Sequence, residues 1–214
     1  MSVTHHPAEE LLIAYAGGVA DEGTSLVIAT HLALCPMCRR TVASAEAAGG
    51  ALLSGMTPAP LGNAALKNVL SRLDEQTKPF EHAPPAKAAI FPEPLRSYFG
   101  GDLERVKWIS VTKGISVKPV FRHGATRVQL IRSLPGAGVG IHSHRGEELT
   151  LVLEGGFTDV TGHYLRGDLQ TADPSLTHRP MTDEGGPCIS LAVTGARLRF
   201  TSPLVGLLAK FYGF

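Results

Sequence analysis

The sequence is poor in cysteine, in aromatic residues and in excess charge of either sign. Its 214 residues include three cysteines and one tryptophan, and 20 basic against 19 acidic residues leave a net charge of +1. Three cysteines cannot build a disulfide framework, which favours a reducing compartment and metal or thiol chemistry. A nearly neutral chain lacks the basic surface that binds phosphate backbones, so direct nucleic-acid binding is disfavoured.

The sequence also lacks a stretch that would anchor it in a membrane. No apolar run approaches the roughly 18 residues that a membrane-spanning helix needs. Residues 1–15 contain acidic residues and histidines, whereas a secretory signal begins with basic residues and continues with an apolar run. We therefore predict a cytoplasmic protein without membrane contacts. The length allows one large domain or two small ones.

Residues 1–77 have the apolar spacing of amphipathic helices. We expect four helices here. Asp21 is placed to cap the second helix, and the pairs Gly17-Gly18 and Gly49-Gly50 are placed to end helices, because aspartate accepts orphan amides and glycine disfavours helix interiors. A domain of about 75 residues buries a small core and often needs a metal or a partner to fold firmly.

A proline-rich segment, 78–94, separates this region from a different pattern in residues 95–214. Such proline density cannot continue a helix or a central strand, so we interpret 78–94 as a linker. Beyond it, short runs of Val, Ile, Leu and Phe recur at intervals of about ten residues, which is typical of an antiparallel barrel or sandwich. The expected strands are 106–109, 116–121, 125–130, 148–153, 156–159, 168–171, 189–193 and 198–200. Residues 204–214 are expected to form an apolar tail or a short helix.

The first candidate metal cluster consists of His31, Cys35 and Cys38. Thiolates beside an imidazole favour a closed tetrahedral zinc site. Pro36 suits the first position of a third helix, so that Cys35 would cap this helix with its sulfur near the positive end of the helix dipole. The alternatives are a chance cluster of thiols beside a surface histidine, and a redox Cys-x2-Cys pair without metal. The candidates for a fourth ligand are His5 and His6.

The second cluster has the spacing Gly136-x5-His142-x-His144-x3-Glu148-x6-Gly155. The period of a strand places His142 and His144 on one side, and Glu148 returns to that side on the next strand. This spacing resembles the first motif of the cupins, which implies a barrel with a metal inside. The second cupin motif implies a fourth ligand after a Gly-Asp pair. Here His178 follows such a pair at a longer gap, with His163 as the alternative. Zinc, iron, manganese or nickel would suit these donors, and a barrel without metal is the remaining alternative.

The run His31-x3-Cys35-x2-Cys38, in a helical region with an upstream histidine, resembles the zinc-binding anti-sigma domain. The longer gap before His178 and the stretch 144–153 extend the resemblance to ChrR-type anti-sigma factors over essentially the whole chain. The resemblance implies that His6 is the fourth zinc ligand. It also implies that the fourth helix clasps an extracytoplasmic-function sigma factor. That role would fall on an apolar stripe at helical spacing, Leu66, Val69, Leu70 and Leu73.

The fold class expected from these patterns is a zinc-stabilised four-helix domain followed by a cupin-like antiparallel barrel. The resemblance implies a transcriptional regulator, not an enzyme, that releases its sigma factor in response to singlet oxygen or organic hydroperoxides. The alternative is a metal-dependent cupin dioxygenase or isomerase joined to a helical adaptor, because imidazoles and a carboxylate around iron can activate oxygen. The stripe on the fourth helix has an alternative too, since it could pack only against its own bundle.

Overall fold

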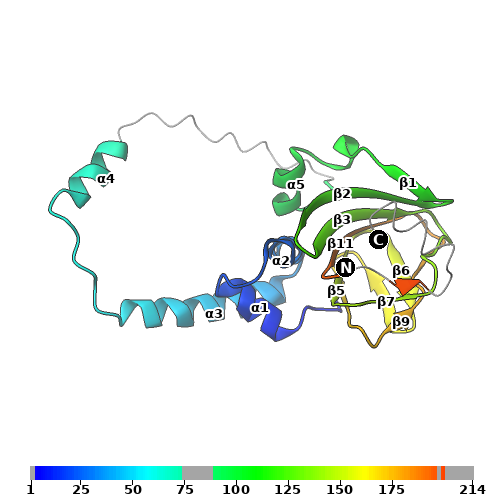
Figure 1. The fold of residues 1–214 in the computed structure, drawn as a ribbon, viewed down its shortest axis with the longest axis horizontal. Coiled ribbons are helices and arrows are strands. Elements are labelled where there is room, and N and C mark those ends of the chain that lie inside the picture. The colour runs from blue at the N-terminus through cyan, green and yellow to red at the C-terminus, as the bar shows by residue number, and fades with distance from the viewer. Residues whose placement is uncertain (1–2, 74–88, 197–198, 201–214) are drawn as a thin grey trace.

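The structure, a computed structural model, describes residues 3–73, 89–196 and 199–200 and has a helical part and a β part (Figure 1). The helical part contains α1 (Glu9–Ala16), α2 (Glu22–Leu34), α3 (Pro36–Ser54) and α4 (Ala65–Leu73). This confirms the four expected helices. The β part opens with a short helix, α5 (Glu93–Phe99), and a 3-10 turn over Leu103–Arg105. In the part of the chain that the structure describes, every helix is too short or too polar to cross a bilayer.

The helix ends follow the expected chemistry with one exception. The Asp21 carboxylate accepts hydrogen bonds from the amides of Gly23 (2.9 Å) and Thr24 (3.2 Å), which confirms it as the cap of α2. The pair Gly17-Gly18 ends α1 as expected. The expectation for Gly49-Gly50 is wrong, because α3 continues through both glycines to Ser54. A glycine inside a helix lowers the helix stability by only about 1 kcal/mol relative to alanine, and the flanking alanines and leucines favour the helix enough to offset this.

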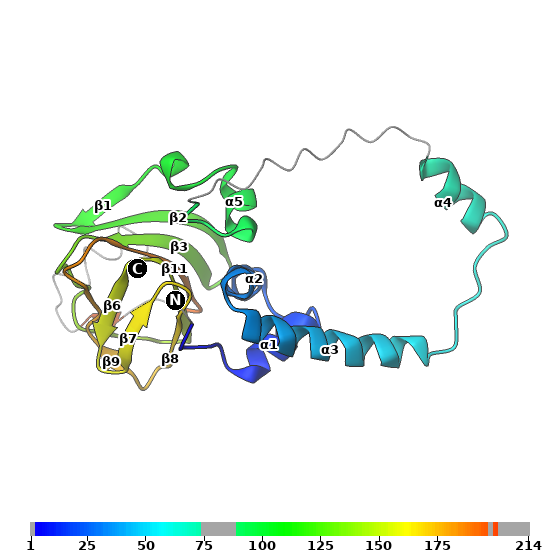
Figure 2. The ribbon, with the colours of Figure 1, turned by 180° about the vertical axis from the view of Figure 1, so that it is seen from behind.

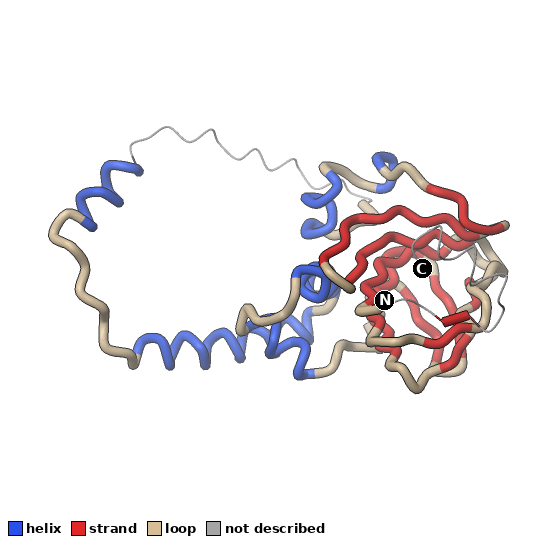
Figure 3. Tube along the Cα trace, in the orientation of Figure 1, coloured by secondary structure: helices blue, strands red, loops and turns tan. Residues whose placement is uncertain are grey.

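The β part forms three antiparallel sheets that curve round a common centre (Figure 3). The six-stranded sheet has the order β1-β2-β3-β11-β5-β8, and the two smaller sheets have the orders β10-β6-β7 and β12-β4-β9. This confirms the cupin-like antiparallel fold class. The strands are β1 (Ile109–Thr112), β2 (Ile115–His123), β3 (Thr126–Ser133), β4 (His142–Ser143), β5 (Glu148–Glu154), β6 (Gly156–Asp159), β7 (Gly162–Leu165), β8 (Leu169–Ala172), β9 (Thr177–His178), β10 (Met181–Thr182), β11 (Cys188–Thr194) and β12 (Arg199–Phe200).

Seven of the eight expected strands coincide with observed ones, whereas the expected strand 106–109 is displaced to β1. The displacement has a local cause, because the Asp102 carboxylate accepts hydrogen bonds from the amides of Ile90, Phe91 and Leu103 and so holds a turn just before this segment. The short strand β4 falls where a strand was expected to carry His142 and His144, although it ends at Ser143. The other short strands, β7, β9 and β10, carry little alternating pattern in their two to four residues. The expected tail at 204–214 lies outside the described residues.

The helical and β parts share one hydrophobic core. Helix α2 packs against β3, β5 and β11, and α5 packs against α2. Figures 1 and 2 show α2 beside the large sheet from opposite views, while α4 stands apart. The closest approach is at Gly23, where an added Cβ would lie 2.9 Å from Val128 Cγ2 and 3.0 Å from Val193 Cγ1. The buried side chains on this core include Leu26, Val27, Ile28, Leu95, Val128, Leu130, Leu151, Leu191 and Val193.

The predicted linker, 78–94, lies mostly outside the described residues, which resume at 89. In its described end, Phe91 is buried in the shared core and Glu93 begins α5. The division into domains 1–77 and 95–214 stays a prediction.

Candidate metal centres

The first centre lies where the start of the chain meets α2 and α3. One donor atom from each of His6, His31, Cys35 and Cys38 falls within a group whose members are all within 4.8 Å of one another. The Nδ1 atom of His6 is 3.4 Å from the sulfurs of both cysteines. The structure therefore brings together the three residues of the sequence motif and the upstream histidine that the resemblance implied.

The local sequence explains the placement of the two thiols. Pro36 begins α3, and Cys35 caps this helix by accepting a hydrogen bond from the Cys38 amide at 3.4 Å. Both side chains are buried. Burial, the hydrogen bond with Cys35 and the charge of that neighbouring thiolate raise the pKa of Cys38 to about 12. Two ionised sulfurs at this point would therefore need a cation between them.

His31 has a fixed orientation and an unpartnered nitrogen. Its Nδ1 lies 2.9 Å from the Gly167 carbonyl oxygen, which can only accept, so Nδ1 carries the proton and Nε2 carries a lone pair. Nε2 is buried without a hydrogen-bond partner among the described residues. Burial is the main cause that lowers the pKa of His31 to about 4, so the ring stays neutral. An orphaned lone pair beside two thiols and a second imidazole fits a tetrahedral zinc-type ion.

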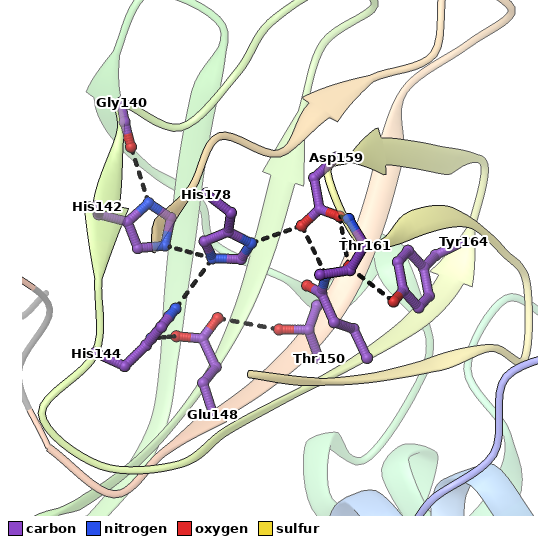
Figure 4. A network of polar contacts seen from close by, with 10 residues as sticks. Gly140, His142, His144, Glu148, Thr150, Asp159, Thr161, Tyr164 and His178 are labelled. Atoms are coloured by element: carbon purple, nitrogen blue, oxygen red, sulfur yellow. Dashed lines mark hydrogen bonds and ion pairs between the residues drawn. The ribbon is translucent and has the colours of Figure 1, made fainter. Parts of the chain in front are cut away.

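The second centre lies inside the barrel, where three imidazoles converge (Figure 4). His142 on β4 is paired across the strands with His178 on β9, and His144 follows β4 directly. The Nε2 atom of His178 is 3.0 Å from Nε2 of His144 and 3.1 Å from Nε2 of His142. These three residues form the second group of donors that could hold a metal.

The hydrogen bonds behind these rings set their tautomers. Nδ1 of His142 donates to the Gly140 carbonyl at 2.8 Å, and Nδ1 of His178 donates to Asp159 Oδ2 at 2.6 Å. Burial would raise the pKa of Asp159, but hydrogen bonds from Thr161, His178 and Gln170 outweigh it and lower the pKa, so the carboxylate is an acceptor. The Nε2 atoms of these two rings, which lie 3.1 Å apart, are the atoms left to face an ion. A carboxylate behind a histidine whose other nitrogen faces the centre matches the carboxylate-histidine-metal pattern of metal centres.

Glu148, the fourth residue of the sequence motif, lies at the edge of this group and not within it. Its Oε2 is 3.3 Å from His144 Nδ1, and its Oε1 accepts a hydrogen bond from Thr150 at 3.1 Å. Burial would raise its pKa, but the nearby rings of His144 and His142 and the hydrogen bond from Thr150 lower it. The carboxylate is therefore anionic and can balance the charge of an ion held by the imidazoles. That it ligates the ion stays a prediction.

The alternative ligands lie elsewhere. His163, on β7, is half exposed, and its Nε2 lies 2.7 Å from Asp183 Oδ2. His5 lies 4.3 Å from the ring of Tyr164, centroid to centroid, and 3.5 Å from the Asp168 carboxylate. The residues left one choice open at each centre. The structure places His6, and not His5, at the helical centre, and His178, and not His163, at the barrel centre.

Sequence reasoning missed the residues that hold the ligands from behind. Asp159 accepts from the Thr161 amide two residues later, and this Asp-x-Thr pattern indicates only a turn. Nothing local reveals that the same carboxylate meets His178. The Gly167 carbonyl is equally hidden, because any residue has one.

A small cavity with a mixed lining lies beside the barrel centre. It has a volume of about 50 Å³, room for only a few water-sized molecules. His142 and Glu148 contribute to its wall, and so does the buried thiol of Cys188. The remaining lining residues are Gln129, Ile131, Ser133, Val139, Thr150, Phe157, Gln170, Pro180, Thr182 and Ser190.

The stripe on α4 packs against nothing in the described residues. No residue of this helix is buried. The exposed fractions are 70% for Leu66, 59% for Val69, 51% for Leu70 and 74% for Leu73. Four apolar side chains on one exposed helix face form a surface suited to a protein partner.

The fold and its two donor groups define a cupin-like protein with a helical extension and two candidate metal centres. The profile of the ChrR cupin-like domain matches residues 97–196. The chain is 39% identical over 214 residues to the anti-sigma-E factor ChrR of Cereibacter sphaeroides, and the alignment covers 99% of each chain. The crystal structure of Rhodobacter sphaeroides SigE in complex with the anti-sigma ChrR matches with a TM-score of 0.81 and 38% identity, covering 90% of this chain and 100% of that chain. The chain belongs to the ChrR family of anti-sigma factors.

Proposed function

We propose that this protein sequesters an extracytoplasmic-function sigma factor through α4 and releases it in response to an oxidant. The observation that carries the proposal is the exposed stripe Leu66, Val69, Leu70 and Leu73, which the helical bundle leaves uncovered. It is supported by the full-length similarity to ChrR, a protein solved in complex with a sigma factor. A sigma factor acts on RNA polymerase, so the proposed place of action is the cytoplasm.

The helical centre is proposed to hold zinc through His6, His31, Cys35 and Cys38. Two thiols and two imidazoles make a closed site, in which the ion links the segment before α1 to α2 and α3. The metal would therefore contribute to the folding of the helical domain. The proposed boundaries put this helical domain in 1–77, the linker in 78–94 and the sensory barrel domain in 95–214.

The barrel centre is proposed to hold the responsive metal through His142, His144, His178 and Glu148. Zinc is the first choice, with iron, manganese or nickel as alternatives for these donors. Imidazoles and thiols are oxidisable, and the cavity beside His142 admits only small molecules such as an oxidant. Singlet oxygen and organic hydroperoxides are the proposed signals. Loss of one ligand would weaken the metal's hold on the loop after β4 and on β9 together.

The alternative function is a metal-dependent oxygenase or isomerase, which the same cavity and donors favour. Elemental analysis and an oxygen electrode separate the two. Zinc at both centres without oxygen consumption supports the sensor. One iron per chain with oxygen consumption supports the enzyme.

The test of sigma binding uses a matched pair of variants. Replacing Leu66 and Leu70 together by Asp puts two charges on the stripe. The control, Val160→Asp, puts a charge on an apolar residue of the β6–β7 turn that is still more exposed, at 78%. Co-purification of the untagged sigma factor should be lost in the first variant and kept in the second. Equal binding by all three proteins would contradict the proposal.

A further inference from the structure

The centre in the helical part is not built from helices alone, because a turn of the barrel touches it. This turn, residues 165–168, connects β7 to β8. Its Gly167 carbonyl accepts the hydrogen bond that orients His31. Gly167 has a φ of +94°, and an added Cβ would lie 2.7 Å from Val3 Cγ2 and 3.6 Å from Leu34 Cβ. The turn is therefore wedged between the segment before α1 and the end of α2.

The next residue, Asp168, holds the segment that leads into His6. Its Oδ1 accepts hydrogen bonds from the amides of Thr4 (2.7 Å) and His5 (2.9 Å). Its Oδ2 accepts from the Leu165 amide at 2.9 Å, and the Leu169 amide donates to the His5 carbonyl at 3.1 Å. The side chain is 2% exposed. One buried carboxylate thus ties two consecutive backbone amides to the barrel.

These contacts matter because His6 is the one donor of the centre that lies neither on a helix nor at the cap of one. His31 lies on α2, Cys38 lies in the first turn of α3, and Cys35 is the cap between them. The position of His6 depends on the residues before α1, and Thr4 and His5 are fixed by Asp168. Burial would raise the pKa of Asp168, but the three backbone hydrogen bonds lower it, so an anion holds the amides.

We infer that Asp168 is a positioning residue of the helical metal centre. It fixes His6 through the backbone of Thr4 and His5, while the adjacent Gly167 carbonyl fixes His31, so the barrel supplies the outer support for both imidazoles. The inference rests on the metal ligation proposed above. Outer partners of metal ligands typically contribute about 10- to 100-fold in metal affinity.

The test compares Asp168→Ala with Asp173→Ala in the full-length chain. Asp173 is the control, because its carboxylate, like that of Asp168, accepts a hydrogen bond from a backbone amide. The donor is Ser175, at 2.7 Å, and the turn is exposed. Competition with a chromophoric zinc chelator should show about 10- to 100-fold weaker binding at the helical centre in Asp168→Ala. The barrel centre of Asp168→Ala and the helical centre of the control should be unchanged.

Cobalt in place of zinc provides a readout that a general loss of stability would not reproduce. The absorption of Co²⁺ bound to two thiolates should change in Asp168→Ala towards the spectrum of His6→Ala, while Asp168→Asn, which keeps an acceptor oxygen, should stay closer to the parent. Combining His6→Ala with Asp168→Ala should cost less affinity than the sum of the single losses, since both act on one ligand.

The outcomes separate this inference from the proposed function. Parent-like zinc affinity and cobalt spectrum in Asp168→Ala would overturn the inference and leave the metal site standing. Equal weakening at both centres would also overturn it, because that result indicates general unfolding. A parent protein without metal among His6, His31, Cys35 and Cys38 would instead overturn the proposed site itself.

Discussion

The helical centre takes its four donors from the segment before α1, from α2 and from the start of α3, whereas the barrel centre takes its imidazoles from paired strands and the residue beside them. In the first, few backbone hydrogen bonds connect the pieces that carry the donors. In the second, the strand ladder connects them independently of any ion. The difference predicts that a metal at the helical centre would be part of the fold, whereas a metal at the barrel centre could change without loss of the barrel.

The largest expected effect concerns the helical centre. Cys38→Ser removes a thiolate from a site where structural zinc contributes on the order of 10 kcal/mol to folding. The helical bundle should loosen and the sigma factor should be released, measured by circular dichroism and co-purification. Cys188→Ser, a change of the third buried cysteine, is the control and should keep the partner. Sigma binding that survives Cys38→Ser would break the comparison.

The barrel centre should respond differently to the loss of a ligand. His142→Ala is expected to keep sigma binding, because the ladders of the large sheet do not depend on this ring, and to blunt release by an organic hydroperoxide. Release from an immobilised complex measures the effect. His163→Ala, outside the centre, should release normally. A His142→Ala protein that releases its partner as the parent does would remove the barrel metal from the sensing step.

Acid should weaken both parts, because each contains a buried histidine whose pKa is lowered. Burial, as the main cause, lowers the pKa of His31 and of His142 from 6.5 to about 4. Between pH 6.5 and pH 4 the unfolded chain binds more protons than the folded chain, so stability falls as the pH falls. The slope is up to about 1.4 kcal/mol per pH unit for each residue. Urea unfolding of chelator-treated protein at pH 7.5, 6 and 5 measures it, and a flat profile would contradict the burial of these rings.

The smallest effects come from two glycines in the helical part. Gly49→Ala should stabilise the protein by about 0.5–1 kcal/mol, because Gly49 lies inside α3 with nothing within 4 Å of an added Cβ. Gly23→Ala should destabilise it by about 1–3 kcal/mol, because the added Cβ meets Val128 and Val193. A thermal unfolding midpoint that rises in Gly49→Ala and falls in Gly23→Ala would confirm both placements. Midpoints that rise in both variants would contradict the shared core.

The sequence predicted those parts of each centre that depend on spacing along one element. Pro36 indicated the start of α3 and the cap at Cys35, and the His-x-His spacing placed two imidazoles side by side. The residues alone left His5 and His6 open, because both precede α1 and only the contact of Asp168 with His5 separates them. Contacts between distant segments, such as the Gly167 carbonyl with His31, have no local signal.

The shared core was hidden for a related reason. The apolar face of α2 predicts that this face is buried, but the periodicity does not say whether helices or a sheet cover it. The sheet covers this face. In the sequence, the feature that allows the contact is a single glycine, Gly23, at the start of the helix. Glycine also occurs at helix starts for other reasons, so Gly23 alone does not predict that the sheet covers this helix.

That glycine has a mechanical consequence. The first turn of α2 meets the methyl groups of Val128 on β3 and Val193 on β11 with its backbone, because Gly23 places no side chain between them. A shift of these strands therefore presses directly on the backbone of α2, and only the two valine side chains can rotate to accommodate it. The same helix carries His31 near its other end.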